Sequence, residues 1–416
     1  MSRKMAGGAA ALMSGALVLG ACAQGGPAGA EGAFTDDKVV IGVLNDQSGV
    51  YKDLSGPNSV TAVEMAVADY KEKYGDDAAV DEIEVITADH QNEPDVANTK
   101  AQEMYDRLGA DIILDVPASS AALAVASQAD AKKKLHFNIG AATTELTGAQ
   151  CSPYVFHWAY DTYMLANGTG TTVTENGGKN WQIIYPDYAF GQDMEKSFSA
   201  AIEAAGGSVG GKIATPFPND NFSTFLTRAA ADGPDVIGTM QAGGDLINLV
   251  KQYNEAGLRE QGISLAVGLM FITDIHSLGV DQFAGTTFTD AWYWNMDEES
   301  RAWADRFAEE TGGQRPSFAH AGNYSAAWQY LEAVQAAGTD DADAVVEDLS
   351  GKEVEDVFLR NGTIRAEDHR VVHDVYLAEV KAPEEVTEDW DYETILNTIP
   401  AEQAFRPVAD SGCEMG

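Results

Sequence analysis

The sequence predicts an α/β protein with two parallel-sheet lobes. Short apolar, β-branched runs alternate with helical patterns from residue 38 to about residue 143, and the same alternation restarts at residue 180 and continues to residue 271. The 416 residues are 45% hydrophobic, which is enough for two domains with apolar cores. Buried strands that alternate with helices form a parallel sheet covered on both faces, so each block predicts one lobe.

The first block begins with the run KVVIGVLN, residues 38–45, a buried strand bounded by polar residues. A turn-rich loop follows, and then apolar residues at helical spacing across 59–75. The remaining elements of this block are strands at 81–90, 110–116 and 135–139 and helices at 94–108 and 121–134.

The second block repeats the unit with a strand at 180–187 and a helix at 191–207 that ends at a glycine pair. It continues with strands at 208–217, 234–240 and 263–271 and helices at 222–233 and 245–257. Helical patterns return at 299–312 and 324–338, and a β-like segment covers 363–381. We expect this third part to pack back on the first lobe.

The chain starts with a pattern typical of an export signal. Arg3 and Lys4 precede an uncharged run of Ala, Gly, Leu, Met and Val that ends in LVLGAC at Cys22. This ending resembles the lipobox of bacterial lipoproteins, in which the cysteine carries the lipid and becomes the new N-terminus. The alternative is a secreted protein with an incidental cysteine. The following Gly-, Ala- and Pro-rich residues 22–36 predict a flexible tether, and no later segment is apolar enough to span a membrane.

The composition limits the possible partners. The 65 acidic and 26 basic residues give a net charge of −39, which argues against nucleic acid and against anionic lipid as direct ligands. Cys151 and Cys413 are the other two cysteines, and in an exported protein they predict a disulfide that holds the C-terminal tail. No spacing of Cys or His indicates a metal site, and no cofactor is expected.

Ligands of open parallel sheets bind beyond the carboxyl ends of the strands. These ends carry hydroxyls, amides and aromatic rings, at 45–51, 115–120, 140–143, 185–190, 240–243 and 270–274. There is no nucleophile elbow, phosphate loop or dinucleotide fingerprint, and His157, His320 and His373 are scattered, so we expect structural histidines and no enzyme. Ser119 and Ser120 precede a helix, where they either cap it or help its free amides to bind a carboxylate.

Several segments together resemble the periplasmic solute-binding proteins of ABC importers, in the branched-chain amino-acid-binding (type I) family. They are VVIGVLNDQSGVYKDLSGPNSVTAVEMAVADY, PASSAALAVASQA with GAATTELTG, IIYPDYAFGQDMEKS and FAHAGNYSAAWQYLEAV. The resemblance spans nearly all of residues 38–380. It implies two Rossmann-like lobes joined by a three-crossover hinge, with a solute held between them and delivered to a permease and its ATPase.

The resemblance also assigns a carboxylate site. Relatives hold the solute's carboxylate with a serine and with amides of an Ala-Ala-Thr segment, which match Ser120 and Ala141 to Thr143 here. An aromatic side chain of the second lobe covers the ligand, and Tyr188 or Phe190 is its counterpart. The full set of candidate ligand-binding residues is Tyr51, Ser119, Ser120, Ala141, Ala142, Thr143, Tyr188, Phe190, Gln241 and Phe271.

Two positions depart from the family pattern. The acid that binds an amine in relatives would fall at Met270–Phe271, where no carboxylate stands, and a large aromatic is replaced by Gln241 and its neighbours. Both changes favour a roomier, more apolar ligand, such as an aromatic or other organic carboxylate. Asp46 or Asp274 could still receive an amine, so an amino acid stays open.

These observations together predict an exported substrate-binding lipoprotein of an ABC importer that is anchored at the membrane by Cys22. The alternatives are a sensor module for a signalling partner, an amide- or urea-binding protein, and a secreted α/β hydrolase. The expected organisation is a signal peptide at 1–21, the tether at 22–36, lobe 1 at 37–159, lobe 2 at 160–290, a return to lobe 1 at 291–370, and a return to lobe 2 with the tail at 371–416.

Overall fold

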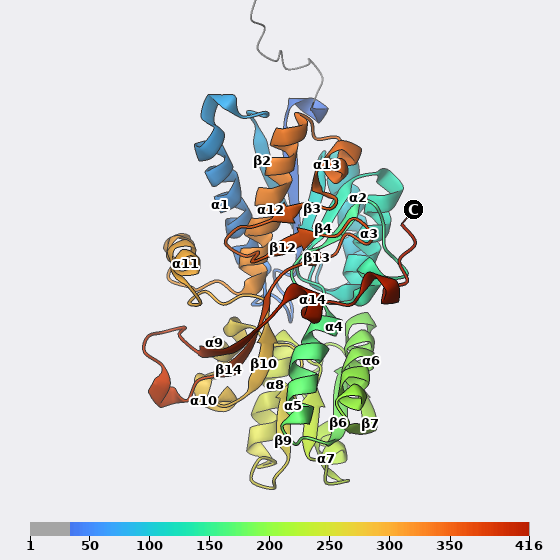
Figure 1. The fold of residues 1–416 in the computed structure, drawn as a ribbon, viewed down its shortest axis with the longest axis vertical. Helices are drawn as coiled ribbons and strands as arrows, with labels where there is room; N and C mark the ends of the chain where they lie inside the picture. Colours follow the sequence, from blue (N-terminus) through green and yellow to red (C-terminus); the bar gives the residue numbers. More distant parts are fainter. Residues whose placement is uncertain (1–33, 416) are drawn as a thin grey trace, which may run out of the picture. The chain divides into compact units, whose positions relative to one another are not determined.

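The structure, a computed structural model, describes residues 34–415, and these residues form two α/β lobes (Figure 1). The predicted signal peptide, Cys22 and most of the tether lie outside the described residues. Within the described range, no helix is both long and apolar enough to cross a bilayer. The predicted fold class, two parallel-sheet lobes joined by three crossovers, is confirmed.

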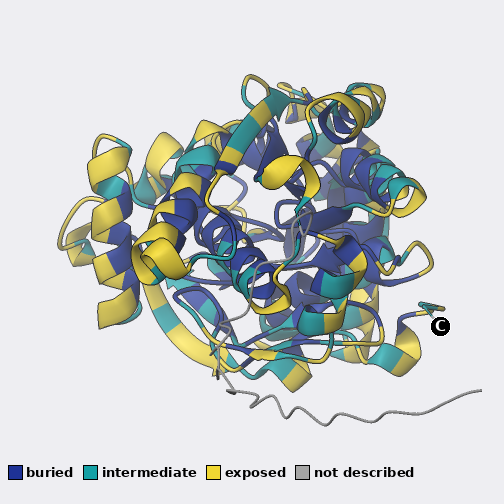
Figure 2. Ribbon diagram, turned by 90° about the horizontal axis from the view of Figure 1, so that it is seen from above, coloured by how far each residue is buried: buried dark blue, intermediate teal, exposed yellow. Residues whose placement is uncertain are grey.

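Lobe 1 is built on a parallel sheet of five strands in the order β2-β1-β3-β4-β5. The strands are β1 (Val39–Asn45), β2 (Ile83–Asp89), β3 (Ile112–Asp115), β4 (Leu135–Asn138) and β5 (Val155–His157). Every residue of β1 is buried because helices cover both faces of the sheet, which Figure 2 shows as dark blue strands beneath partly exposed helices.

Six longer helices of lobe 1 come from two distant parts of the chain. They are α1 (Gly56–Tyr74), α2 (Pro94–Arg107), α3 (Ser119–Lys132), α11 (Glu298–Glu310), α12 (Phe318–Ala337) and α13 (Ala342–Leu349). Helix α12 packs along α1, where Tyr324 donates to Asp69 at 2.7 Å and Ser317 Oγ donates to the Leu54 carbonyl at 3.0 Å. These bonds join two segments of lobe 1 that lie more than 250 residues apart in the chain.

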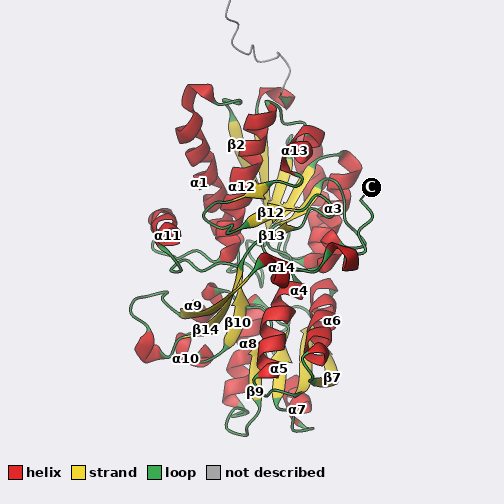
Figure 3. Ribbon diagram, viewed as in Figure 1, coloured by secondary structure: helices red, strands yellow, loops and turns green. Residues whose placement is uncertain are grey.

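Lobe 2 combines a parallel and an antiparallel sheet (Figure 3). The parallel strands β6 (Asn180–Pro186), β7 (Ser208–Thr215), β8 (Val236–Thr239) and β9 (Ser264–Val267) have the order β7-β6-β8-β9. The antiparallel strands are β10 (Thr287–Asp290), β14 (Val375–Val380) and β15 (Glu393–Ile399). The helices are α4 (Thr162–Leu165), α5 (Thr171–Glu175), α6 (Ala189–Ala204), α7 (Ser223–Ala230), α8 (Gly243–Glu255), α9 (Ile272–Leu278) and α10 (Val280–Phe283).

The chain passes between the lobes after β5, after β10 and after the small lobe 1 sheet of β11 (Glu353–Val354), β12 (Gly362–Ile364) and β13 (Val371–Val372). Two of these crossovers are tied together by a buried ion pair, in which Arg370 Nε donates to Asp161 Oδ2 at 2.9 Å. Burial lowers the pKa of the Arg370 guanidinium to about 10, which Asp161 partly offsets. His373 Nε2 lies 2.8 Å from the Ala159 carbonyl and links the same two segments.

The tail after β15 forms the short helix α14 (Ala401–Ala404) and then returns to lobe 1. The predicted Cys151–Cys413 disulfide is present, with a Cα–Cα distance of 5.7 Å. The C-terminal end therefore lies against lobe 1 rather than beside the strands of lobe 2 that precede it (Figure 1).

Candidate ligand-binding site

The loop after β1 reaches from lobe 1 to lobe 2, and Asp46 gives the loop its form. One carboxylate oxygen of Asp46 accepts the Gly49 amide at 2.6 Å and the other accepts the Tyr51 amide at 2.8 Å. This turn directs the Val50 carbonyl to the Gly244 amide of α8, 3.0 Å away. It also brings the Tyr51 hydroxyl within 2.6 Å of the Tyr188 hydroxyl.

Aromatic rings from both lobes meet at this contact. The Phe217 ring lies 4.4 Å from Tyr188 and 5.3 Å from Tyr51, and Phe190 is 5.9 Å from Tyr188. Burial raises the pKa of Tyr51 well above its usual value, so its hydroxyl stays protonated. Three of the candidate residues, Tyr51, Tyr188 and Phe190, are thus brought together. Phe217 is not among the candidates predicted from the sequence, although an aromatic residue at the end of the predicted 208–217 strand was a usable signal.

A second aromatic group lies nearer the hinge. Phe271 stacks on Phe318 at 4.4 Å, and Tyr160 meets Phe318 at 4.9 Å and Phe271 at 6.3 Å. The Tyr160 hydroxyl donates to the Gly140 carbonyl at 2.6 Å, which fixes the loop after β4. Tyr160 is buried, and burial raises the pKa of its hydroxyl well above the usual value.

The start of α3 offers hydrogen-bond donors without partners. Neither serine caps this helix, because its N-cap residue is Ala118 and no side chain caps it. Ser119 is fully buried, and its hydroxyl has no hydrogen-bond partner among residues 34–415. The backbone amides of Ser119 and Ser120 also lack an acceptor in that range. Four free amides at a helix start attract negative charge, so this end suits an anion.

The loop after β4 lies beside α3, since β3 and β4 are paired and their ends meet at one edge. The Ala141 amide is already used, because it donates to Asn138 Oδ1 at 3.1 Å. The Thr143 amide has no acceptor in the described part of the chain. Ala142 is buried, and its carbonyl accepts the Thr162 amide at 2.9 Å. Among the three Ala-Ala-Thr candidates, Ala142 and Thr143 are therefore the residues whose amides have no acceptor among residues 34–415.

Three acids lie near the aromatic rings. Asp46 is occupied by the turn, and Asp274 accepts the Phe271 amide at 2.9 Å at the start of α9. Asp245, which the sequence analysis did not single out, sits in the first turn of α8 and is 2% exposed. Burial raises the pKa of Asp245 to about 7, and its charge would raise the pKa values of Tyr51 and Tyr188. Asp245 is thus the acid coupled to the tyrosine pair.

Gln241 and the glycines after it shape the lobe 2 side. Gln241 is buried, donates to Thr215 Oγ1 at 3.1 Å, and its Oε1 has no partner among the described residues. Gly243 has φ +55°, and a Cβ there would meet the Val50 carbonyl at 2.5 Å. Only glycine permits both this backbone and the close approach of the two lobes.

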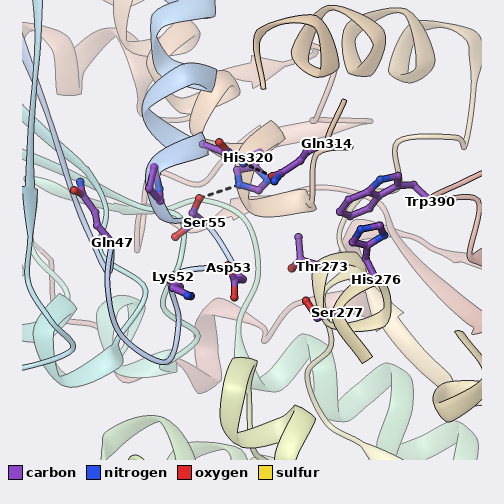
Figure 4. A pocket seen from close by; sticks show the side chains of 12 residues that line it. Gln47, Lys52, Asp53, Ser55, Thr273, His276, Ser277, Gln314, His320 and Trp390 are labelled. Carbon is purple, nitrogen blue, oxygen red and sulfur yellow. Dashed lines mark hydrogen bonds between the residues drawn. The ribbon is translucent and has the colours of Figure 1, made fainter. Parts of the chain in front are cut away.

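A cavity of about 310 Å³ lies between the loop that precedes α1 and the helix α9 (Figure 4). Lys52 and Asp53 of lobe 1 face Thr273 and Ser277 of lobe 2 across it. None of the ten candidate residues lines this cavity. The four aromatic candidates instead contact other aromatic rings away from this cavity.

The three histidines are structural in their contacts. Burial lowers the pKa of His157 to about 3 and those of His320 and His373 to about 4, so all three are neutral. Each contacts a backbone carbonyl, and His157 Nε2 lies 2.8 Å from the Ala141 carbonyl. Residues 34–415 contain no cluster of His, Cys, Asp or Glu able to hold a metal ion.

The chain matches the family model of periplasmic binding proteins over residues 38–385. It is 42% identical to a periplasmic binding protein from Burkholderia mallei, with a TM-score of 0.87 over 91% of this chain and 99% of that one. A branched-chain amino acid ABC transporter periplasmic ligand-binding protein from Burkholderia xenovorans LB400 is 36% identical, with a TM-score of 0.80 and the same coverage. An ABC transporter solute-binding protein from Rhodopseudomonas palustris BisB5, in complex with 3,4-dihydroxybenzoic acid, shares the fold at 24% identity, with a TM-score of 0.76 over 88% of this chain and 98% of that one.

The match over most of its length shows that this chain belongs to the periplasmic binding protein family. Within that family it is similar to solute-binding proteins of ABC transporters, which are transport components and not enzymes.

Proposed function

We propose that this protein is the extracytoplasmic substrate-binding lipoprotein of an ABC importer, and that it captures a small organic carboxylate between its lobes. The observation that carries the proposal is the buried, unpartnered Ser119 hydroxyl among the free amides at the start of α3. A buried polar group without a partner costs about 1–3 kcal/mol, so a ligand oxygen that satisfies it gains that energy. Ser120 and Thr143 supply further amide donors beside it.

The body of the ligand would lie against the aromatic rings. Tyr51, Tyr188, Phe217 and Phe271 present apolar ring surface, and the position matching the family's amine-binding acid holds Phe271 instead of a carboxylate. This composition favours an aromatic or other apolar carboxylate, the class bound by the distant relative from Rhodopseudomonas palustris BisB5. We rank aromatic carboxylates first.

A branched-chain amino acid is the second candidate, and Asp245 is the observation in its favour. Burial raises the pKa of its carboxyl to about 7, and an ammonium group nearby would lower that pKa and favour the carboxylate. The relative from Burkholderia xenovorans LB400 carries a branched-chain amino acid name. Amides and urea lack the charge that the α3 amides favour, so they rank last.

Calorimetry on the mature protein with benzoate, 4-hydroxybenzoate and leucine tests the site. Ser119→Ala and Ser120→Ala each remove a hydroxyl beside the proposed carboxylate position. A hydrogen bond to a charged group is worth about 1.5–3 kcal/mol, so loss of the Ser119 contact should weaken binding about 10- to 100-fold. If both variants bind the preferred solute as tightly as the wild type, the carboxylate site lies elsewhere.

Delivery to a permease and the lipid anchor belong to the same proposal. LVLGAC at residues 17–22 supports lipidation of Cys22 and removal of residues 1–21, and the acyl chains would keep the protein near its permease. Mass spectrometry of the membrane-bound protein tests it, because an unmodified Cys22 would be incompatible with the anchor. A sensor role would instead require a signalling partner. Co-purification of a permease and its ATPase with this protein would argue against the sensor role.

A further inference from the structure

The C-terminal tail connects the two lobes by a path separate from the three crossovers. It leaves lobe 2 at the end of β15, and the Ala401 amide at the start of α14 donates to Asp374 Oδ1 at 3.2 Å. The tail then crosses to lobe 1, where Cys413 is bonded to Cys151. In Figure 1 this dark red segment passes beside α4 and ends near α3.

Phe405 of the tail packs on the hinge. It is 3% exposed, and the Arg370 guanidinium lies 4.2 Å from its ring. The His373 ring is 5.4 Å away. Arg370 is the residue that pairs with Asp161, so Phe405 covers the place where the first and third crossovers meet. Any motion of these crossovers must disturb the Phe405 contact.

Arg406 holds the loop that follows the candidate amides. Its Nη2 donates to the carbonyls of Thr144, at 3.1 Å, and of Thr147, at 3.5 Å. The Arg406 carbonyl in turn accepts from Arg365 Nη1 at 2.8 Å, which fixes the tail on lobe 1. Thr144 directly follows Thr143, and its amide donates to Asp193 of lobe 2 at 2.7 Å. Arg406 therefore acts on a loop that also contacts the other lobe.

We propose that the tail is a positioning strap: Phe405 and Arg406, held by the Cys151–Cys413 disulfide, fix the hinge and the 141–147 loop in the arrangement that binds the solute. The effect on solute binding rests on the proposed function, whereas the effect on the loop does not. Length alone does not restrain the lobes, since the 13 residues from 400 to 412 could span up to roughly 45 Å when extended. The restraint comes from the docked side chains.

Hydrogen exchange of the mature protein, read by mass spectrometry without any ligand, tests the strap. The amides of Thr144, Gly148 and Gln150 are protected by bonds of 2.7, 3.1 and 3.1 Å, and they report opening of the loop. Arg406→Ala should speed their exchange roughly 10- to 100-fold, the factor expected for one lost charge-assisted hydrogen bond. Arg406→Lys keeps a donor and should restore most of the protection.

Glu402→Ala, an exposed change in the same tail, is the matched control and should leave exchange unchanged. The double variant Cys151→Ser/Cys413→Ser should raise exchange in the same loop while amides in β1 keep their wild-type rates. Wild-type exchange in Arg406→Ala would overturn the proposal, and so would faster exchange spread over both lobes, because that pattern indicates general destabilisation.

Benzoate affinity separates this inference from the proposed function. If the wild type binds benzoate, Arg406→Ala should weaken binding and Arg406→Lys should restore it. If the wild type binds none of the tested solutes, the proposed ligand class is wrong, and loop exchange alone still decides the role of the strap.

Discussion

The Tyr51–Tyr188 hydroxyl contact joins the lobes directly, and a double-mutant cycle measures what it contributes. Tyr51 is 2% exposed, and its hydroxyl has no hydrogen-bond partner other than Tyr188 among residues 34–415. Tyr188→Phe therefore leaves this buried hydroxyl unpaired. Leaving such a buried group unpaired costs about 1–3 kcal/mol, or roughly a 5- to 150-fold drop in the ratio of closed to open protein. Tyr51→Phe should cost a similar amount, because burial also raises the pKa of Tyr188, whose hydroxyl then loses its partner.

The double variant Tyr51→Phe/Tyr188→Phe removes both hydroxyls and should recover part of the loss, since no polar group is then left unpaired. Single-molecule fluorescence between dyes at Leu108 in lobe 1 and Lys251 in lobe 2 would give the closed fraction. Both positions are exposed and far from the contact in sequence. Our interpretation fails if Tyr188→Phe closes as well as the wild type, or if the double variant is worse than either single one.

Three further predictions concern the cleft and the hinge. Gly243→Ala places a Cβ 2.5 Å from the Val50 carbonyl at φ +55°, so it should lower solute affinity in calorimetry at least tenfold while the protein stays folded. The pKa of Asp245 is raised to about 7 in the folded protein from 3.8, so its stabilising effect is present below about pH 4 and is lost as pH rises through 7. In urea unfolding, Asp245→Asn should remove this fall in the free energy of unfolding with rising pH. At pH 8 the variant should be more stable than the wild type. Asp161→Ala leaves the buried Arg370 charge unpaired and should lower the free energy of unfolding by about 3–5 kcal/mol in urea.

The Asp161 prediction has a matched control, and each of the three has an outcome that would contradict it. Asp106→Ala breaks an exposed pair with Lys132 and should cost less than about 1 kcal/mol. An Asp161→Ala protein no less stable than Asp106→Ala would contradict the hinge argument. Unchanged solute affinity in Gly243→Ala would show that the lobes close without this contact. If Asp245→Asn keeps the wild-type pH dependence of stability, other carboxyls cause that dependence.

Most strands of the two parallel sheets were predictable because each is an apolar run between polar turns, whereas β5, β10 and β15 were missed. The run at 38–45 became β1, and the pattern at 94–108 became α2. The helical segment 162–175 was missed, since Asn, Thr and Gly in it have poor helix propensity. Its glycines serve packing: a Cβ at Gly168 would lie 2.1 Å from Thr289 Oγ1 of β10. A contact made by residues 121 positions apart leaves no local signal in the sequence.

The candidate site was predictable in part, because several of its residues lie at the carboxyl ends of strands. Strand ends pointed to Tyr51, Ser119 and Tyr188, and the structure places Tyr51 against Tyr188. Phe217 and Asp245 were missed, because their nearness to the tyrosines depends on how the lobes meet. The sequence also could not show which of Ser119 and Ser120 is buried, since successive side chains of a helix point about 100° apart around its axis.

The pairing of α1 with α12 sets the order in which this chain can fold. The Leu54 carbonyl accepts its hydrogen bond from Ser317, which is synthesised 263 residues later. Asp69 likewise accepts from Tyr324. Until α12 has been synthesised, the side of α1 that packs on it stays uncovered, so lobe 1 stays incomplete during most of synthesis. Contacts this distant in sequence slow folding. A chain that stays incomplete for so long exposes apolar surface that is prone to aggregation until its last third has been synthesised.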